Sequence, residues 1–191
     1  MTAPAWLEDS LRGMTRVSFQ EKEIAALRQA IDLSEELISD FYKITTSEWR
    51  RHRYDIQSLK DLQEEEITNI AFAQIRRYVR SPNLRERGSE PGDFFKICLQ
   101  DHVILKAIER DPHIRLLPLA TYIVIHELIH VIRFSKFLQR FDSTPAERDA
   151  EERLVHSLTF RVLGKFRVNG MDEVLAAFTD CRTMETFFGA Q

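Results

Sequence analysis

The residues best suited to chemistry in this sequence lie in one short stretch, HELIH at positions 126–130. His126 and His130 stand four residues apart, so on a helix they project from one face, one turn apart. Two imidazoles held in this way can bind one metal ion from a single rigid element. Glu127 falls within the same arc, which is roughly 100° wide. The stretch therefore predicts a divalent metal site with a carboxylate beside it.

The helix face that carries the two histidines is otherwise apolar, because it also carries Ile123, Phe134 and Phe137. Burying imidazoles and a carboxylate without partners costs roughly 1–3 kcal/mol for each unsatisfied group. A zinc ion removes that cost, since Zn²⁺ suits neutral imidazole nitrogen, and three protein ligands leave one position for water. Glu127 would then be placed to take a proton from that water. Satisfied core histidines without a metal are the competing interpretation.

The stretch with its uncharged flanks, Ile123 to Ile132, resembles the signature of the zincin metallopeptidases, which carry HExxH on a helix. The resemblance implies zinc as cofactor, His126 and His130 as ligands, Glu127 as general base, and a peptide or protein as substrate. The gluzincin branch of that family takes its third ligand from a glutamate on the following helix. The segment from Glu151 to Val155 loosely resembles that glutamate helix.

Four side chains further along the sequence are candidates for the third ligand: Glu147, Glu151, Glu152 and His156. Glu147 closes a capping box with Thr144, so it has a structural explanation of its own. Glu151 is centred on an apolar stripe, where a carboxylate needs a buried partner. Glu152 and His156 lie towards the edge of the stripe and could form an ordinary exposed pair. We predict Glu151 as the third ligand and His156 as second choice, with Glu147 and Glu152 ranked behind them. The apolar members of the stripe are Leu154, Val155, Leu158 and Val162.

A dinuclear iron centre is the main alternative to zinc. Glu127 and His130 also form an ExxH pair, the unit that ferritin-like four-helix bundles use for a di-iron site. A second such pair is missing, because neither Glu151 nor Glu152 is followed by histidine at that spacing. A zincin-like domain without catalytic activity is a further alternative. Bridging carboxylates for a dinuclear centre could come from Glu35, Glu36, Asp40, Glu64, Glu65 and Glu66.

The elements that must position these residues are predicted from hydrophobic periodicity. The pattern predicts a mainly helical, single-domain multi-helix bundle over residues 1–191, with the metal-binding helix pair at about 117–166. Partial alternation around 95–105 allows one minor strand. Zincin peptidases bind their substrate along a sheet edge, so the lack of a clear strand counts against peptide cleavage. The predicted helices cover about 19–45, 59–79, 93–110, 118–141, 145–166 and 171–178.

Composition and charge limit the partners. A net charge of -3 argues against nucleic acid, although Trp49–Arg53 and Arg76–Arg80 place arginines beside aromatic residues. The longest apolar run is too short to span a membrane and contains Pro118. Cys98 and Cys181 form no CxxC pair, which excludes a zinc ribbon. No signal peptide is visible. We expect a cytoplasmic protein with neither a nucleic-acid nor a membrane partner, and its oligomeric state is open.

Overall fold

The computed structural model describes residues 15–49, 53–78, 94–136, 138 and 144–179. The prediction of a mainly helical chain is confirmed, but a three-stranded sheet accompanies the helices. The helices are α2 (Glu21–Tyr42), α3 (Thr46–Trp49), α4 (Asp101–Arg110), α5 (Leu116–Ser135), α6 (Pro145–Leu163) and α7 (Met171–Thr179). The strands are β1 (Tyr54–Gln57), β2 (Ala73–Tyr78) and β3 (Phe94–Leu99), and two short 3-10 helices are Leu59–Asp61 and Glu64–Glu66.

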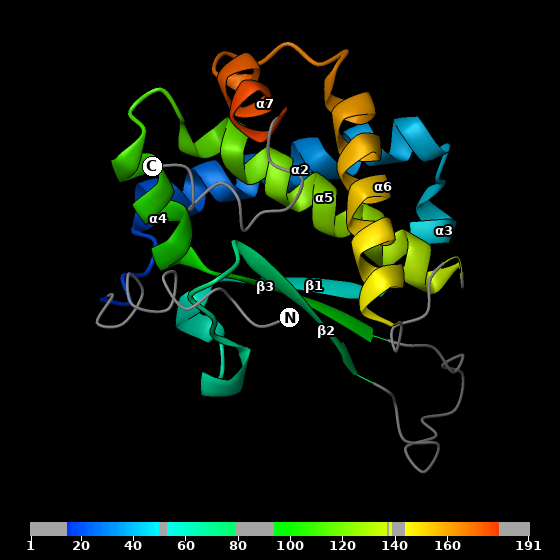
Figure 1. The fold of residues 1–191 in the computed structure, drawn as a ribbon, viewed down its shortest axis with the longest axis horizontal. Coiled ribbons are helices and arrows are strands. Elements are labelled where there is room, and N and C mark those ends of the chain that lie inside the picture. Colours follow the sequence, from blue (N-terminus) through cyan, green and yellow to red (C-terminus); the bar gives the residue numbers. More distant parts are fainter. Residues whose placement is uncertain (1–14, 50–52, 79–93, 137, 139–143, 180–191) are drawn as a thin grey trace.

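Helix α5 is the centre of the fold. It packs against α2, α6 and α7, and the helical layer lies on one side of the sheet (Figure 1). Every residue from Pro118 to Ile132 is buried. By length and composition α5 could cross a membrane, but 83% of its most apolar window is buried inside the protein, as in the core helix of a globular fold. The two histidines are therefore held by the most thoroughly packed element of the described chain.

Strand β3 is the middle strand of the sheet, parallel to β1 and antiparallel to β2. The predicted helix at 93–110 is wrong in its first half, where β3 runs, and right in its second half, where α4 runs. The strand expected around 95–105 is confirmed only to Leu99. Five of the six residues of β3 are buried, and they include side chains on both faces of the strand. A strand covered on both faces lacks clean alternation, so periodicity alone does not separate it from a helix.

The predicted helix at 59–79 is also wrong, since this segment forms the two 3-10 helices and then β2. Side chains at the start of α4 form hydrogen bonds with the backbone of this segment. The Asp101 carboxylate accepts from the Leu59 amide at 3.0 Å. The Gln100 side chain accepts from the Thr68 amide at 3.0 Å and donates to the Glu66 carbonyl at 2.9 Å. These bonds replace the local bonds of a helix, and their partners lie far away in the sequence.

The start of α6 follows the prediction. The Thr144 hydroxyl accepts from the Glu147 amide at 3.3 Å, and the Glu147 carboxylate accepts from the Thr144 amide at 2.7 Å, which completes the capping box. Helix α6 ends at Leu163, slightly before the predicted end. The preceding helix, α5, ends at Ser135. Its predicted end near residue 141 lies outside the described residues.

Candidate metal centre

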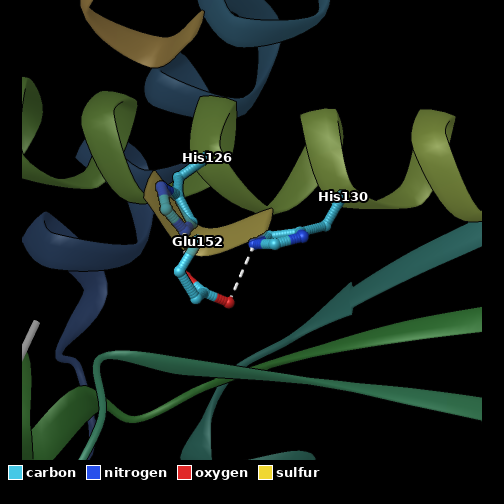
Figure 2. A group of neighbouring side chains, drawn as sticks. All are labelled: His126, His130 and Glu152. Carbon is cyan, nitrogen blue, oxygen red and sulfur yellow. Dashed lines mark hydrogen bonds and ion pairs between the residues drawn. The ribbon is translucent and has the colours of Figure 1, made fainter. Parts of the chain in front are cut away.

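The two histidines of α5 and one carboxylate of α6 converge on a common point. Figure 2 shows the His126 and His130 side chains projecting from α5 towards the Glu152 carboxylate. Nε2 of His126 lies 3.3 Å from Oε2 of Glu152, and Nε2 of His130 lies 3.3 Å from Oε1. One ligand atom from each residue lies within 4.8 Å of the other two. Among the residues that the structure describes, this is the one group of three side chains spaced to hold a metal ion.

The spacing of these atoms fits a zinc ion. Zinc bonds of about 2.0–2.1 Å to nitrogen and oxygen, arranged tetrahedrally, place the ligand atoms about 3.3 Å apart. Each imidazole nitrogen lies 3.3 Å from a Glu152 oxygen, although the two distances run to different oxygens of the carboxylate. Two imidazole nitrogens and one carboxylate also match the ligand types of zinc sites that keep one position open.

The group is buried on the α5 side and open on the α6 side. His126 and His130 are 4% and 5% exposed, whereas 44% of the Glu152 side chain is exposed. Solvent therefore reaches the group past Glu152. An open coordination position on that side would be accessible to water or a small ligand.

The choice of Glu151 as third ligand is corrected by its contacts. Its carboxylate accepts two hydrogen bonds from the Arg133 guanidinium, one from Nε and one from Nη2, the latter at 2.9 Å. Glu151 is 8% exposed, so the sequence argument that it needs a buried partner holds, but the partner is an arginine. The structure brings Glu152, the next residue, to the histidines instead.

The sequence contained a signal for this pairing. Arg133 follows His130 by three residues, so it lies on the same face of α5. A partly buried arginine on that face favours a carboxylate partner from the helix packed against it. Assigning Glu151 to Arg133 would have left Glu152 for the histidines.

The other two candidates have different partners. Glu147 lies in the capping box of α6, as predicted. Nδ1 of His156 lies 2.7 Å from the Tyr122 hydroxyl, and its Nε2 lies 3.0 Å from the Phe178 carbonyl. Burial and the nearby His126 lower the pKa of His156 below its ordinary value, which favours a neutral ring. With both ring nitrogens hydrogen-bonded, His156 offers no free nitrogen to a metal ion.

Three of the six carboxylates considered for a dinuclear centre pair with other side chains. Glu35 accepts a hydrogen bond of 2.5 Å from the Tyr54 hydroxyl. Glu66 pairs with Lys96 at 2.7 Å, and Glu64 pairs with Arg16. Within the described part of the chain, none of the six carboxylates proposed as bridges joins His126, His130 and Glu152.

Glu152 and Glu127 differ in their electrostatic environment. Burial opposes ionisation of Glu152, but hydrogen bonds with His126 and His130 outweigh it and hold the pKa of this carboxyl well below its usual range. Glu127 is 7% exposed, and burial raises its pKa to about 7, against the opposing effect of His126. Glu152 is therefore an anion suited to a cation, whereas Glu127 can exchange a proton near neutral pH.

An edge of the sheet lies close to the site helix. Strand β2 is at the end of the order β1-β3-β2, and it packs against α5. One side of β2 pairs with β3, which leaves its other side without a strand partner among the described residues. This is the kind of element to which an extended peptide can add as a further strand.

Comparison with protein-family models, with curated proteins and with solved structures finds no match to this chain.

Proposed function

We propose that the chain binds one zinc ion through His126, His130 and Glu152 and acts as a zinc-dependent hydrolase. The observation that carries the proposal is the convergence of two buried imidazole nitrogens on one ionised carboxylate, with one ligand atom of each residue within 4.8 Å of the other two. A bound zinc ion supplies a Lewis acid that polarises a carbonyl group and lowers the pKa of water. The third ligand is Glu152 in place of Glu151.

Glu127 is the general base of this proposal. It lies next to the proposed ligand His126 on α5. A general base acts best when its pKa lies near the working pH. In the metal-free protein, burial raises the pKa of the Glu127 carboxyl group to about 7, which is the direction that a general base requires. Its task is to accept a proton from the attacking water and to pass it to the leaving group.

A peptide or protein is the substrate class that the surroundings favour. The HExxH stretch resembles zincin peptidases, and the open edge of β2 beside α5 supplies the sheet edge that such enzymes use. The sequence predicts a helix where β2 runs, so a sheet edge for peptide binding was not expected there. The presence of this edge supports a peptide or protein as substrate.

The first experiment is elemental analysis of the purified protein. About one zinc per chain is expected, because the described residues contain one group of three ligands. About two irons per chain would favour the dinuclear alternative, and a protein that binds no divalent metal on addition would refute the proposal.

The second experiment separates ligand from base. Glu127→Gln should retain zinc and lose hydrolysis of unstructured peptides, whereas the control Glu109→Gln, at an exposed carboxylate of α4, should retain both. Loss of zinc from Glu127→Gln would make Glu127 a ligand. A zinc-loaded wild-type protein that cleaves no peptide in a broad panel would leave a zincin-like domain without catalytic activity.

A further inference from the structure

The two imidazoles of the site lack the hydrogen bonds that usually orient metal-binding histidines. Nδ1 of His126 and Nδ1 of His130 are buried and have no hydrogen-bond partner in the part of the chain that the structure describes. Metal-binding histidines ordinarily donate from their second nitrogen to a carboxylate, a carbonyl group or water, and this bond fixes the ring orientation. Another contact must therefore fix the orientation of both rings.

Aromatic rings on α5 provide that contact, one helical turn to either side of the pair. The Tyr122 ring stacks on His126 with centroids 6.4 Å apart and an interplanar angle of 25°. The Phe134 ring stacks on His130 at 5.9 Å and 19°. The two imidazoles meet edge to face at 5.0 Å. Each imidazole thus lies between its neighbour and one aromatic ring, in geometries that aromatic pairs prefer.

Phe134 is itself held by the sheet. It stacks on Phe95 of β3 at 5.8 Å and 18°. Phe95 is 1% exposed, so its ring is fixed by the core. The orientation of His130 is therefore tied to the central strand.

Tyr122 is held by α6 and α7. Its ring stacks on Phe178 at 4.3 Å and 12°. A backbone carbonyl only accepts, so the contact between His156 Nε2 and the Phe178 carbonyl places the ring hydrogen on Nε2. Nδ1 of His156 then accepts from the Tyr122 hydroxyl. Because the hydroxyl and the ring face of Tyr122 both have fixed partners, the ring has one orientation to offer His126.

We propose that Tyr122 and Phe134 are positioning residues of the metal site, whose rings take the place of hydrogen bonds to Nδ1 of His126 and His130. This inference rests on the proposed function, since it concerns the same site. It has a clear physical consequence. A smaller side chain at either position frees one imidazole to rotate, and the ordering of that ring then has to occur when the ion binds.

The test is zinc affinity, measured by competition with a chromogenic chelator. Loss of an outer partner of a metal ligand typically weakens metal binding 10–100-fold. We expect Phe134→Leu and Tyr122→Leu each to weaken zinc binding by about tenfold, near the lower end of that range. Tyr122→Phe keeps the ring and should stay within about threefold of the wild type. The matched control is Phe72→Leu, a core ring that contacts Phe178 at 6.2 Å.

Visible absorption of the cobalt(II)-loaded protein gives a second readout, because its ligand-field bands report the geometry of the ligands. Both leucine variants should shift these bands, and Phe72→Leu should not. Phe134 is only partly buried, so Phe134→Leu tests the inference even where Tyr122→Leu fails to fold.

The outcomes are distinct. Unchanged affinity and unchanged cobalt spectra in folded Phe134→Leu would overturn the inference while leaving the proposed metal site intact. An equal loss of affinity in Phe72→Leu would also overturn it, since the effect would then be one of general stability. A wild-type protein that binds neither zinc nor cobalt would overturn both the inference and the proposed function.

Discussion

Exchange of two consecutive carboxylates of α6 for amides distinguishes the structural role from the metal-binding role. Glu151→Gln and Glu152→Gln make the same chemical change one residue apart. The first acts on the pair with Arg133, and the second acts on the group with His126 and His130. The two variants should therefore fail in different assays.

Glu151→Gln should lower the stability of the metal-free protein. Hydrogen bonds to charged groups contribute about 1.5–3 kcal/mol each, and the glutamine can still accept one bond from Arg133 through its amide oxygen. We expect the free energy of unfolding to fall by about 2 kcal/mol, which at about 2–4 °C for each kcal/mol lowers Tm by about 4–8 °C. Zinc affinity should stay within about twofold of the wild type.

Glu152→Gln should instead abolish the stabilisation by zinc. At a zinc concentration one hundred times the wild-type Kd, binding adds about 2.7 kcal/mol, which raises Tm by about 5–11 °C. A hundredfold weaker affinity in Glu152→Gln leaves only about 0.4 kcal/mol, and Tm then rises by about 1 °C. Glu151→Gln should keep the full zinc-dependent rise, although it starts from a lower Tm.

Differential scanning calorimetry with and without zinc measures both effects on the same samples. Arg133→Met is the cross-check, because it leaves Glu151 buried without its partner and should cost about 3–5 kcal/mol. The reasoning is refuted if Glu151→Gln removes the zinc-dependent rise in Tm while Glu152→Gln retains it. That result would restore Glu151 as the third ligand.

Three further predictions concern the framework around the site. Burial raises the pKa of Glu66, but hydrogen bonds from Lys96, Tyr78 and the Gln63 amide together outweigh it and lower the pKa to about 2. The ionised Glu66 therefore stabilises the fold above about pH 4.5, and this contribution is lost as the pH falls towards about 2. Urea unfolding between these pH values should show this loss, and Lys96→Met should diminish it. Gly170 has φ +96°, and a Cβ there would lie 3.2 Å from the Pro118 side chain, so Gly170→Ala should lower unfolding free energy by about 1 kcal/mol or more in chemical denaturation. Removing the α6 cap with Thr144→Ala should cost about 1 kcal/mol in the same assay, and an unchanged midpoint would contradict the capping role.

Local signals made the helical part of the fold predictable. Helices α2, α6 and α7 follow the predicted spans closely, and α5 does so at its start but ends at Ser135, before the predicted end near 141. Their apolar positions recur at helical spacing, and α6 begins at a recognisable cap. The sheet could not be predicted in the same way. The segment before β2 depends on the side chains of Gln100 and Asp101, whose bonds reach back over 32 and 42 residues. No window of neighbouring residues contains that information.

The site likewise has a part that local sequence signals predict and a part that depends on tertiary contacts. His126, Glu127 and His130 are predictable from the sequence because their spacing on one helix is a local property. The partner on α6 depends on how two helices rotate against each other, and one residue changes the direction of a side chain by about 100°. The difference between Glu151 and Glu152 is set by the contact of Glu151 with Arg133, which is a tertiary contact.

The unequal exposure of the ligand side chains also has a consequence for the speed of metal exchange. The imidazoles are buried in α5, whereas 44% of the Glu152 side chain faces solvent. For an ion bound as proposed, the carboxylate can swing away by a rotamer change, which in exposed side chains takes picoseconds to nanoseconds, while both histidines stay in place. A chelator can then occupy the vacated position and remove the ion stepwise. Exchange would follow the chelator concentration, and its rate would be independent of the rate at which the protein unfolds.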